Sequence, residues 1–383
     1  MTNPLSCDDT EATANAISAL GAKVVRNGQM WLIESNGSPQ APSDEIQCQE
    51  SGVTLRFMIP IVSLTGAAAT LRARESLMRR PLEPLASAMK QLGVDLRIER
   101  DRVTIQGGSP DGGTVQIPGD VSSQFISGLL FAGPLMKKGL RLELNSPLES
   151  RNYVFLTVET MRQHGVLVES DDKMSVFEIS SGQTYSGAEH RTSGDFSSAA
   201  FLLSAAAITG SKLLVRNLRE TNDEPDAVFV EILSRMGVRA EFQEEGVLVE
   251  GGRLKATSVN IRDCPDLGPV TAVLGCYAEG ETRIGGAARL RFKESDRLSA
   301  ITSELSSLGA NITATEDGLI TRGPSSLNGG RVRSHGDHRI AMALSVGALA
   351  AKGPVIIEDA KCVSKSYPTF YDDLRSLGVE IIG

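Results

Sequence analysis

The sequence predicts an α/β protein built from six repeats, and three observations lead to this prediction. A glycine recurs every 72 residues through the first five repeats and after 69 residues in the last. An amphipathic helix ends at each of these glycines, and an extended stretch follows it. A second helix, made of small apolar residues, recurs between them. The recurring glycines are Gly21, Gly93, Gly165, Gly237, Gly309 and Gly378.

The amphipathic helices are the clearest element of the repeat. Each carries apolar residues at helical spacing and ends in a bulky residue followed by the glycine, which fits the left-handed position that closes a helix. The residues after the glycine alternate as in a strand, for example in VDLRIERDRVTIQG. The six stretches are ATANAISALGAKV, LEPLASAMKQLGVDL, FLTVETMRQHGVLV, AVFVEILSRMGVRAEF, LSAITSELSSLGANI and TFYDDLRSLGVEII.

The small-residue helices are apolar nearly all round. This pattern predicts that they are buried and that the amphipathic helices or sheets cover them. One repeat therefore contains two helices and several strands. The five stretches are TLRFMIPIVSL, SSQFISGLLFAG, SSAAFLLSAAAITG, GPVTAVLGCYAEG and HRIAMALSVGALAAKG.

The first repeat has no small-residue helix, so we expect it to be incomplete. Its amphipathic helix starts almost at once, since Asp8, Asp9 and Thr10 are good N-cap residues and Gly21 ends the helix. Because a repeat spans 72 residues, about 50 residues would precede this helix in a complete one. A first repeat that is naturally short is the alternative.

Three repeats in each half predict two domains, residues 1–190 and residues 191–383. We expect the buried helices of each domain to point their N-termini toward a shared cleft. Free N–H groups and the helix dipole would attract anions there.

The composition restricts the partners of the protein. Of the 383 residues 41% are apolar and 22% are charged, and the net charge of -8 argues against a nucleic-acid surface. No apolar run approaches the roughly 20 residues of a membrane span. The first residues lack the basic and apolar regions of a leader. We therefore expect a cytoplasmic protein that binds neither nucleic acid nor membrane.

The cysteines lie far apart, with no CxxC and no histidine at metal-ligand spacing. They predict buried or inert thiols rather than a disulfide framework or a zinc site. They are Cys7, Cys48, Cys264, Cys276 and Cys362.

Polar residues stand at the starts of two small-residue helices. Ser122, Ser123 and Gln124 place two hydroxyls and an amide where an anion could bind, although a simple serine N-cap is the alternative. Asp337 in HGDHRIAM is explained as a cap, but a cap does not account for Arg339 beside an apolar helix.

The densest charged stretch is RLRFKESDRL, which leads into an amphipathic helix. A solvated surface is one interpretation. Alternatively, Lys293, Glu294 and Arg297 at one helix entry can bind an anion and deliver a proton beside it. Further hydroxyls and cations at element ends are Ser150, Arg151, Tyr153, Arg79, Arg80 and Lys365.

The sequence lacks the motifs of several common enzyme classes. The chain has no GxGxxG, no GxxxxGK[ST] and no GxSxG. Cations at the element ends favour a site between two domains for small phosphorylated or carboxylated substrates. Charge-stabilised transfer of a small group is the chemistry that remains.

Six motifs occur in the order LSCDDTEAT, SSQFISGLL, PDLGPVTAV, RLRFKESDRL, GDHRIAMAL and CVSKSYPTF. Together they resemble those of the 5-enolpyruvylshikimate-3-phosphate synthases, from about residue 5 to the end of the chain. The resemblance implies the enolpyruvyl transferase fold, an inside-out α/β barrel in which two domains, each of three βαβαββ units, close over the substrates. The first repeat would be incomplete. It also implies a monomer that needs no cofactor and no metal.

In that family the carboxyvinyl group of phosphoenolpyruvate is transferred to the 5-hydroxyl of shikimate 3-phosphate through a tetrahedral intermediate, and phosphate is released. The resemblance implies that Asp266 is the base on the 5-hydroxyl and that Glu294 donates a proton to the methylene carbon. The residues implied to bind shikimate 3-phosphate are Ser122, Ser123, Gln124, Ser150, Tyr153, Asp266 and Lys293. Those implied to bind phosphoenolpyruvate are Gly52, Arg80, Gln124, Arg297, Arg339 and Lys365.

The chain departs from the family pattern in two places. Glu50-Ser51-Gly52-Val53 stands where many members have Asn-Ala-Gly-Thr. The family's N-terminal strand and its PGSKS-type loop have no counterpart, so we expect the chain as written to have little or no synthase activity. A non-catalytic anion- or partner-binding protein of the same fold is one alternative. The other is UDP-N-acetylglucosamine enolpyruvyl transferase, whose reactive cysteine is absent from ARESLMRRP.

Overall fold

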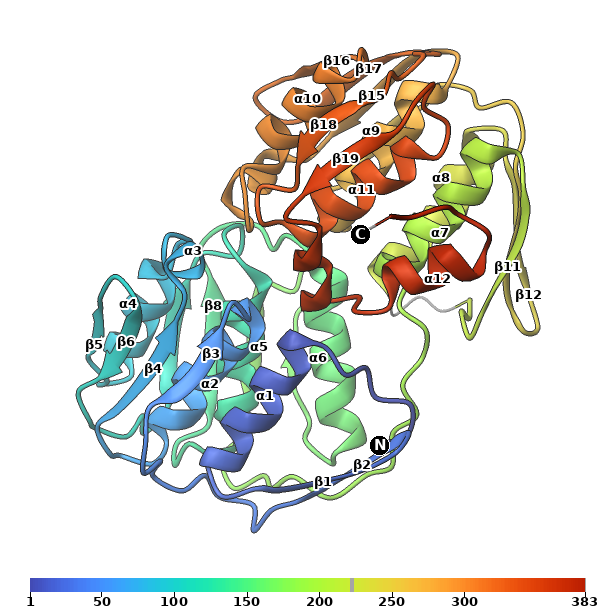
Figure 1. The fold of residues 1–383 in the computed structure, drawn as a ribbon. Coiled ribbons are helices and arrows are strands. Elements are labelled where there is room, and N and C mark those ends of the chain that lie inside the picture. Colours follow the sequence, from blue (N-terminus) through green and yellow to red (C-terminus); the bar gives the residue numbers. More distant parts are fainter. Residues whose placement is uncertain (221–223, 383) are drawn as a thin grey trace. The chain divides into compact units, whose positions relative to one another are not determined.

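The computed structural model describes residues 1–220 and 224–382 and divides into two compact parts (Figure 1). Unit 1 is Met1–Thr192 and unit 2 is Ser193–Gly383, of which Gly383 itself lies outside the described residues. Each unit has its own core of buried apolar side chains.

Unit 1 contains three small sheets, with strand orders β1-β2, β3-β4-β6-β5 and β7-β8-β10-β9. Its elements are α1 (Asp8–Ala19), β1 (Lys23–Asn27), β2 (Met30–Glu34), β3 (Ile46–Gln49), α2 (Gly52–Ser63), β4 (Ala69–Ala73), α3 (Glu75–Met78), α4 (Glu83–Gln91), β5 (Leu96–Ile98), β6 (Arg102–Ile105), β7 (Gly113–Ile117), α5 (Ser123–Ala132), η1 (Gly133–Leu135), β8 (Leu140–Leu144), α6 (Arg151–Gln163), β9 (Glu169–Ser170) and β10 (Val176–Ile179).

The sheets of unit 2 have the strand orders β11-β13-β12, β14-β15-β17-β16 and β18-β19. Its elements are α7 (Phe196–Thr209), β11 (Lys212–Arg216), η2 (Pro225–Val228), α8 (Phe229–Arg235), β12 (Arg239–Gln243), β13 (Gly246–Glu250), β14 (Ser258–Asn260), η3 (Pro265–Leu267), α9 (Gly268–Tyr277), β15 (Gly280–Gly285), η4 (Ala288–Phe292), α10 (Arg297–Ser307), β16 (Asn311–Ala314), β17 (Leu319–Gly323), β18 (Gly330–Arg333), α11 (His338–Ala348), β19 (Val355–Glu358), η5 (Ala360–Lys365) and α12 (Phe370–Ser376).

The order βαβαββ is complete in three stretches, β3–β6, β7–β10 and β14–β17. In each, the first two strands pair in parallel and the last two form an antiparallel hairpin. A parallel pair needs a long crossover, and the small-residue helices α2, α5 and α9 supply it. The amphipathic helices α4, α6 and α10 precede the hairpins.

The other three stretches carry part of this order within the described residues. They are α1–β1–β2, α7–β11–α8–β12–β13 and β18–α11–β19–α12. The first repeat was expected to be incomplete, but the partial order of the fourth and sixth repeats corrects the expectation that the others each have the full βαβαββ order. In the fourth, Asp195 caps α7 only two residues after Ser193 begins unit 2, which leaves no room for a leading strand in that unit.

The buried helices pack on one another inside each unit, and the sheets lie outside them (Figure 1). In unit 2, α7, α9 and α11 contact one another, and in unit 1 α2 contacts α5. The predicted small-residue helices are thus confirmed as buried elements. The N-termini of α2, α5 and α11 lie at candidate site residues.

The six recurring glycines all follow amphipathic helices, with φ between +82° and +95°. This confirms the prediction that they close those helices in the left-handed conformation. At the start of α1 the prediction is corrected, because Cys7 is the N-cap and its backbone N–H donates to Thr10 Oγ1 at 3.0 Å. Asp8 and Asp9 lie in the first turn instead, where their negative charges interact favourably with the positive end of the helix dipole.

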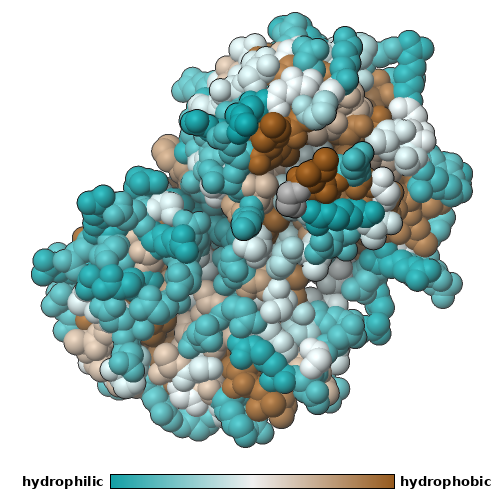
Figure 2. All heavy atoms as spheres, in the orientation of Figure 1, coloured by the Kyte–Doolittle hydropathy of each residue, from teal (hydrophilic) through white to brown (hydrophobic). Residues whose placement is uncertain are grey.

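The β1–β2 hairpin exposes apolar side chains, and Figure 2 shows hydrophobic surface over it. Val25, Met30, Leu32 and Ile33 are between 39% and 55% exposed. Thr2 forms an antiparallel bridge to Met30 along the free edge of β2. Within residues 1–220 and 224–382, no helix combines the length and apolar character needed to cross a membrane.

Candidate active site

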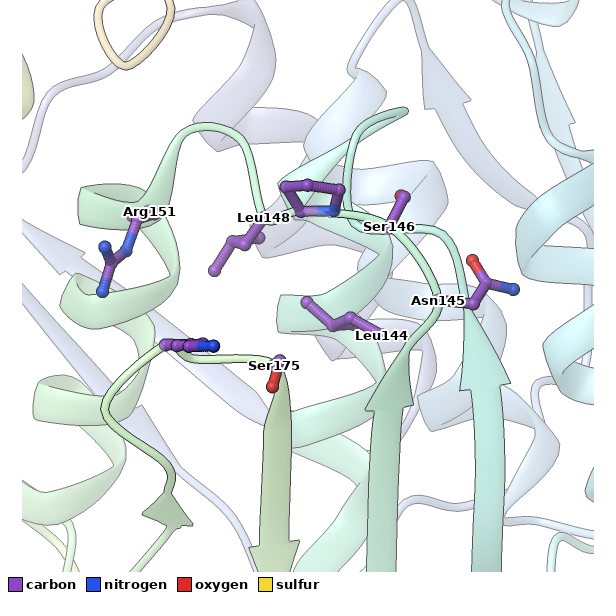
Figure 3. A pocket seen from close by; sticks show the side chains of 8 residues that line it. Leu144, Asn145, Ser146, Leu148, Arg151 and Ser175 are labelled. Carbon is purple, nitrogen blue, oxygen red and sulfur yellow. The ribbon is translucent and has the colours of Figure 1, made fainter.

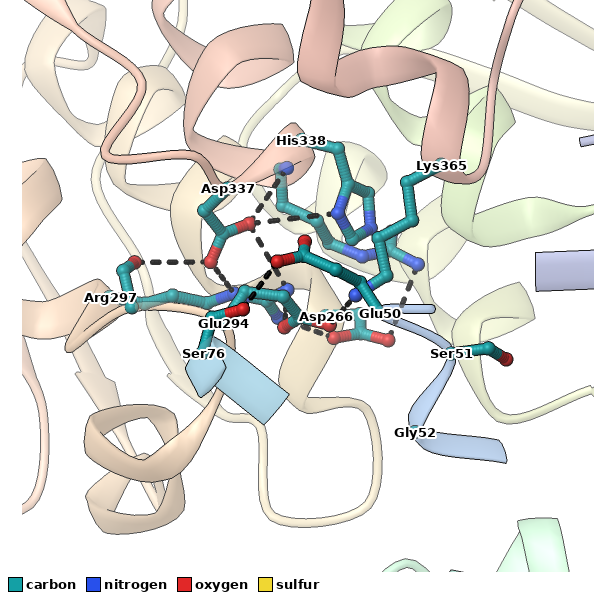
Figure 4. A network of polar contacts seen from close by, with 12 residues as sticks. Glu50, Ser51, Gly52, Ser76, Asp266, Glu294, Arg297, Asp337, His338 and Lys365 are labelled. Carbon is teal, nitrogen blue, oxygen red and sulfur yellow. Dashed lines mark hydrogen bonds and ion pairs between the residues drawn. The ribbon is translucent and has the colours of Figure 1, made fainter. Parts of the chain in front are cut away.

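Arg297 is the centre of a cluster of charged side chains in unit 2 (Figure 4). It is the first residue of α10 and is 1% exposed. Its guanidinium donates to Asp266 at 2.6 Å, to Glu294 at 2.8 Å and to Asp337 at 2.8 Å. A planar guanidinium bound on three sides is held in one orientation. We call Asp266, Glu294, Arg297, Asp337, Arg339 and Lys365 the charged cluster.

Asp266 lies in η3, directly before α9, and is the most exposed carboxylate of the cluster at 22%. Its Oδ2 is 3.3 Å from Nη2 of Arg339. Burial raises the pKa of this carboxyl, but the positive charges of Arg339, Lys293 and Arg297 outweigh burial and hold the pKa far below its usual range. Asp266 is therefore ionised, and an anion that engages these cations would restore part of its basicity.

Glu294 stands between η4 and α10 and bridges two cations. Its Oε1 accepts from Nζ of Lys365 at 2.7 Å, and its Oε2 accepts from Arg297. Glu294 is 14% exposed and Lys365 is 9% exposed, so this contact is largely shielded from water. Glu294 and Arg297 of the RLRFKESDRL stretch therefore lie in a charged site and not on a solvated face, and the charge of Lys293 acts on Asp266 in the same site.

Asp337 closes the cluster at the N-terminus of α11. Its carboxylate accepts from the backbone N–H of Arg339 at 3.0 Å, from Ser295 Oγ at 3.1 Å and from Arg297. Asp337 is fully buried, which raises the pKa of its carboxyl, but the charge of Arg297 outweighs burial and lowers the pKa. Burial also lowers the pKa of His338 to about 3, so its imidazole is neutral.

A second group of predicted residues lies in unit 1 at the start of α2. A Cβ at Gly52 would lie 2.5 Å from Arg56 Nη1 and 3.0 Å from Arg80 Nη1, so glycine leaves the space that the two guanidiniums use. Arg56 is 2% exposed and donates to Gly52 O at 3.3 Å and to Gln124 Oε1 at 3.2 Å. The structure thus brings Gly52, Arg80 and Gln124 together, with Arg56 among them.

Glu50 and Ser51, which depart from the family pattern, make hydrogen bonds that hold the segment before α2 in place. Ser51 is 1% exposed and caps α2, because its Oγ accepts from the backbone N–H of Thr54 at 3.3 Å. Glu50 accepts a hydrogen bond from Ser76, which lies in α3.

The predicted hydroxyls stand at the starts of α5 and α6, which pack on one another. Ser122 occupies the N-cap of α5, but its side chain makes no capping hydrogen bond within the described residues, which favours the anion-site interpretation over the simple cap. Ser150 is the N-cap of α6 in the left-handed conformation, with φ of 57°, and is 3% exposed. Its carbonyl accepts from the backbone N–H of Tyr153 at 3.1 Å. Ser123 and Gln124 are the first residues of α5.

A family model identifies the kind of protein that carries these sites. The model described as EPSP synthase (3-phosphoshikimate 1-carboxyvinyltransferase) matches residues 1–374. The chain belongs to the EPSP synthase family. The 3-phosphoshikimate 1-carboxyvinyltransferase of Methanocorpusculum labreanum is 39% identical over 99% of this chain and 90% of its own length. That of Clostridium kluyveri is 38% identical over 100% of this chain and 89% of its own length.

The chain is also similar to solved structures of this family and fold. An EPSP synthase from Acinetobacter baumannii aligns with a TM-score of 0.79 at 26% identity, over 97% of this chain and 88% of that one. The enolpyruvyl transferase NikO from Streptomyces tendae has a TM-score of 0.76 at 19% identity and shares the fold. The predicted enolpyruvyl transferase fold is confirmed.

Two residues that lie among the candidate site residues of this EPSP synthase family member were not among those predicted from the sequence. Arg56 stands in the apolar stretch TLRFMIPIVSL, and a lone arginine in a buried helix was the available signal. Asp337 was assigned only a capping role, whereas the structure adds its ion pair with Arg297. Pattern alone could not show this second role, because the two residues are 40 positions apart.

A pocket of about 420 Å³ in unit 1 is lined by none of the residues that the family resemblance marks (Figure 3). Arg151 and Lys173 line it together with the apolar side chains of Leu144 and Leu148. Arg151, which the sequence grouped with Ser150 and Tyr153, donates to the carbonyl of Asp172 at 3.3 Å. The pocket therefore adds no residue to the candidate site.

The thiols follow the prediction, since all five cysteines are free and all but Cys362 are buried. Burial raises the pKa of the Cys48, Cys264 and Cys276 thiols to about 12. In the part of the chain that the structure describes, no group of three or more His, Cys, Asp or Glu side chains is arranged to hold a metal ion.

Proposed function

We propose that this EPSP synthase family member transfers the carboxyvinyl group of phosphoenolpyruvate to the 5-hydroxyl of shikimate 3-phosphate and releases phosphate. The reaction is a step of the shikimate pathway toward chorismate and the aromatic amino acids. The names of the relatives favour this activity over a non-catalytic binding protein of the same fold.

The observation that carries the proposal is the placement of two carboxylates on one fixed guanidinium. Asp266 and Glu294 both accept from Arg297, and each also contacts a second cation. Addition of a hydroxyl to an enol needs one group that takes the hydroxyl proton and another that gives a proton to carbon. Two carboxylates held on either side of a buried cation suit those two tasks.

We assign the base to Asp266, which is the more exposed of the two. Substrate anions that engage Arg339 and Lys293 would weaken the ion pairs that lower its pKa. Asp266 then takes the proton of the 5-hydroxyl as the oxygen bonds to C2 of phosphoenolpyruvate, and returns a proton to the leaving phosphate oxygen.

We assign the carbon acid to Glu294. Protonated Glu294 gives its proton to the C3 methylene as the bond to C2 forms, and its carboxylate removes a proton from the resulting methyl group when phosphate leaves. Lys365 and Arg297 hold the two oxygens of the Glu294 carboxylate, which is the form that removes the proton from the methyl group.

Both units supply the substrate contacts that we propose. Arg297, Arg339 and Lys365 of unit 2 bind phosphoenolpyruvate, and Lys293 binds shikimate 3-phosphate. In unit 1, Gly52, Arg80 and Gln124 bind phosphoenolpyruvate. The hydroxyl and amide groups that bind shikimate 3-phosphate are those of Ser122, Ser123, Gln124, Ser150 and Tyr153. We further propose that each unit is one enolpyruvyl transferase domain, and that the protein works as a monomer in the cytoplasm.

The test is phosphate release by the full chain with both substrates present. We expect release, even at a low rate, to require both compounds and to fall when Glu294 is replaced by Gln. UDP-N-acetylglucosamine in place of shikimate 3-phosphate should not support it. Release that persists without shikimate 3-phosphate, or that Glu294→Gln leaves unchanged, would contradict the proposal.

A further inference from the structure

Asp226 is a buried carboxyl of unit 2 that the proposed mechanism does not use. It lies in η2, ahead of α8, and is 3% exposed. Its Oδ2 accepts a hydrogen bond from Ser197 Oγ. A buried carboxyl group needs hydrogen-bond partners, because burial removes the water that would otherwise solvate it.

Ser197 connects Asp226 to the charged cluster. It is the second residue of α7, and its backbone N–H donates to the N-cap Asp195 at 3.0 Å. Its carbonyl accepts from Nη1 of Arg339 at 3.3 Å. Arg339 in turn lies 3.3 Å from Asp266 through its other terminal nitrogen. One serine thus contacts the buried carboxyl through its side chain and the cluster through its backbone.

We propose that Asp226 is a positioning residue, which fixes Ser197 and, through the Ser197 carbonyl, orients the guanidinium of Arg339 for an anionic substrate. The inference rests on the proposed function, since it takes phosphoenolpyruvate as the anion at Arg339.

The charge state of Asp226 follows from the groups that face it. Burial and the negative charge of Asp266 raise the pKa of Asp226 to about 7, whereas the bond from Ser197 and the charge of Arg339 lower it. The charge of Asp195 raises it further, and the Cys264 thiol is a neighbour. Glu224, two residues earlier, accepts from the backbone N–H of Phe196. A neutral Asp226 leaves Arg339 with Asp266 as its main counter-charge.

Ionisation of Asp226 would therefore change the site near neutral pH. A second negative charge beside Arg339 offsets the attraction of that guanidinium for an anion. We expect the KM for phosphoenolpyruvate to rise about three- to tenfold between pH 6 and pH 8, with a smaller change in the KM for shikimate 3-phosphate.

Asp226→Asn separates the hydrogen bond from the charge. The amide can still accept from Ser197 but does not titrate, so the KM for phosphoenolpyruvate should lose the part of its pH dependence that is centred near 7. Asp372→Asn, at an exposed pair with Arg375, is the matched control and should keep the wild-type profile. An Asp226→Asn profile that follows the wild type would overturn the proposal.

A double-mutant cycle tests the route through Ser197. Asp226→Ala and Ser197→Ala should each raise the KM for phosphoenolpyruvate about five- to tenfold, and the double variant should be no worse than either. Additive effects would show that Asp226 does not act through Ser197. Calorimetric titration with phosphoenolpyruvate in the presence of shikimate 3-phosphate gives the same comparison as a dissociation constant where turnover is slow.

Stability against pH provides a readout that needs no activity. Because the folded pKa of Asp226 lies above the unfolded value of about 3.9, the wild type should lose stability relative to Asp226→Asn as pH rises from about 4 to 7, with no further loss above 7. Absence of phosphate release with a normal stability titration would reject the proposed function alone. A stability difference between the wild type and Asp226→Asn that does not change with pH would show that Asp226 is not protonated in the folded protein.

Discussion

Unit 1 and unit 2 place candidate site residues at the same point of their repeats, the start of a buried helix, but with different chemistry. In unit 2 the charged cluster is already paired, with Arg297 and Asp337 at 1% and 0% exposure. In unit 1 the starts of α2, α5 and α6 carry glycine, serines and an amide, with Arg56 and Arg80 beside Gly52. Unit 2 thus has a charged site that is ordered before any ligand binds, and unit 1 presents mainly hydrogen-bonding groups.

The difference teaches which residues serve folding as well as chemistry. A buried ion network is costly to break, because each charge left without a partner remains desolvated. Neutral hydrogen-bonding groups at a helix start can be removed at lower cost. Substitutions should therefore affect stability and function together in unit 2, and mainly ligand binding in unit 1.

Arg297→Ala should have the largest effect. It leaves three carboxylates without their shared cation, so we expect the free energy of unfolding of unit 2 to fall by about 3–5 kcal/mol and phosphate release to disappear. Urea unfolding followed by circular dichroism measures the loss. Arg291→Ala, which breaks a partly exposed pair with Asp296, is the control and should cost about 1 kcal/mol or less. Equal costs for the two variants would show that the buried network of Arg297 adds no more to stability than a partly exposed pair does.

Glu294→Gln keeps the shape of the side chain but removes its acid. We expect turnover to fall about 100-fold or more, since general acid–base groups contribute on that scale. The KM values should change less, because the amide oxygen still accepts from one of the two cations that hold Glu294. Phosphate-release kinetics measure both. A variant with wild-type turnover would show that the proton reaches carbon from another group.

Acid should unfold unit 2 before unit 1. The pKa values of Asp266 and Asp337 are lowered in the folded state, so the stability they provide is present above the unfolded pKa of about 3.9 and is lost as pH falls below it. Pepsin digestion across the acid range, with the fragments identified by mass spectrometry, distinguishes the two units. Cleavage within unit 2 should begin at a higher pH than cleavage within the β3–β10 part of unit 1. Cleavage that begins at the same pH in both would contradict the comparison.

Ser122→Ala tests the unit 1 side and should have the smallest effect, since the Ser122 side chain makes no capping hydrogen bond within the described residues. It removes one neutral group from the start of α5, so we expect the dissociation constants of the substrates to rise about two- to tenfold with little change in melting temperature. Calorimetry and a thermal scan measure the two quantities. Gln116→Ala, at an exposed position of β7, is the control. A fall in stability as large as that of Arg297→Ala would show that unit 1 also depends on a buried network.

Much of the fold could be predicted because its elements repeat. The spacing of Gly21, Gly93 and Gly165 reflects a local requirement, a left-handed residue at each helix end, and such requirements are visible in the chain. The buried helices were equally visible from their composition. The absence of a leading strand before α7 could not be predicted, because a pattern shared by six repeats does not show where a single repeat differs.

The site was predictable where a motif carries it and not where only packing does. Lys293, Glu294 and Arg297 stand in one stretch, and the family resemblance adds Arg339 and Lys365. The pairing of Asp337 with Arg297, and the contact of Arg339 with the Ser197 carbonyl 142 positions away, depend on how α7, α10 and α11 pack. Long-range contacts of this kind leave no periodic signal in a single sequence.

The β1–β2 hairpin has a consequence for the order in which the chain opens. It is a sheet of two strands, whereas the comparable β5–β6 hairpin belongs to a sheet of four. Two strands with exposed apolar side chains bury little surface, so the hairpin can separate without unfolding the rest of unit 1. Its amide hydrogens should exchange with deuterated solvent well before those of β6, which makes the hairpin the first part of unit 1 to visit an open state.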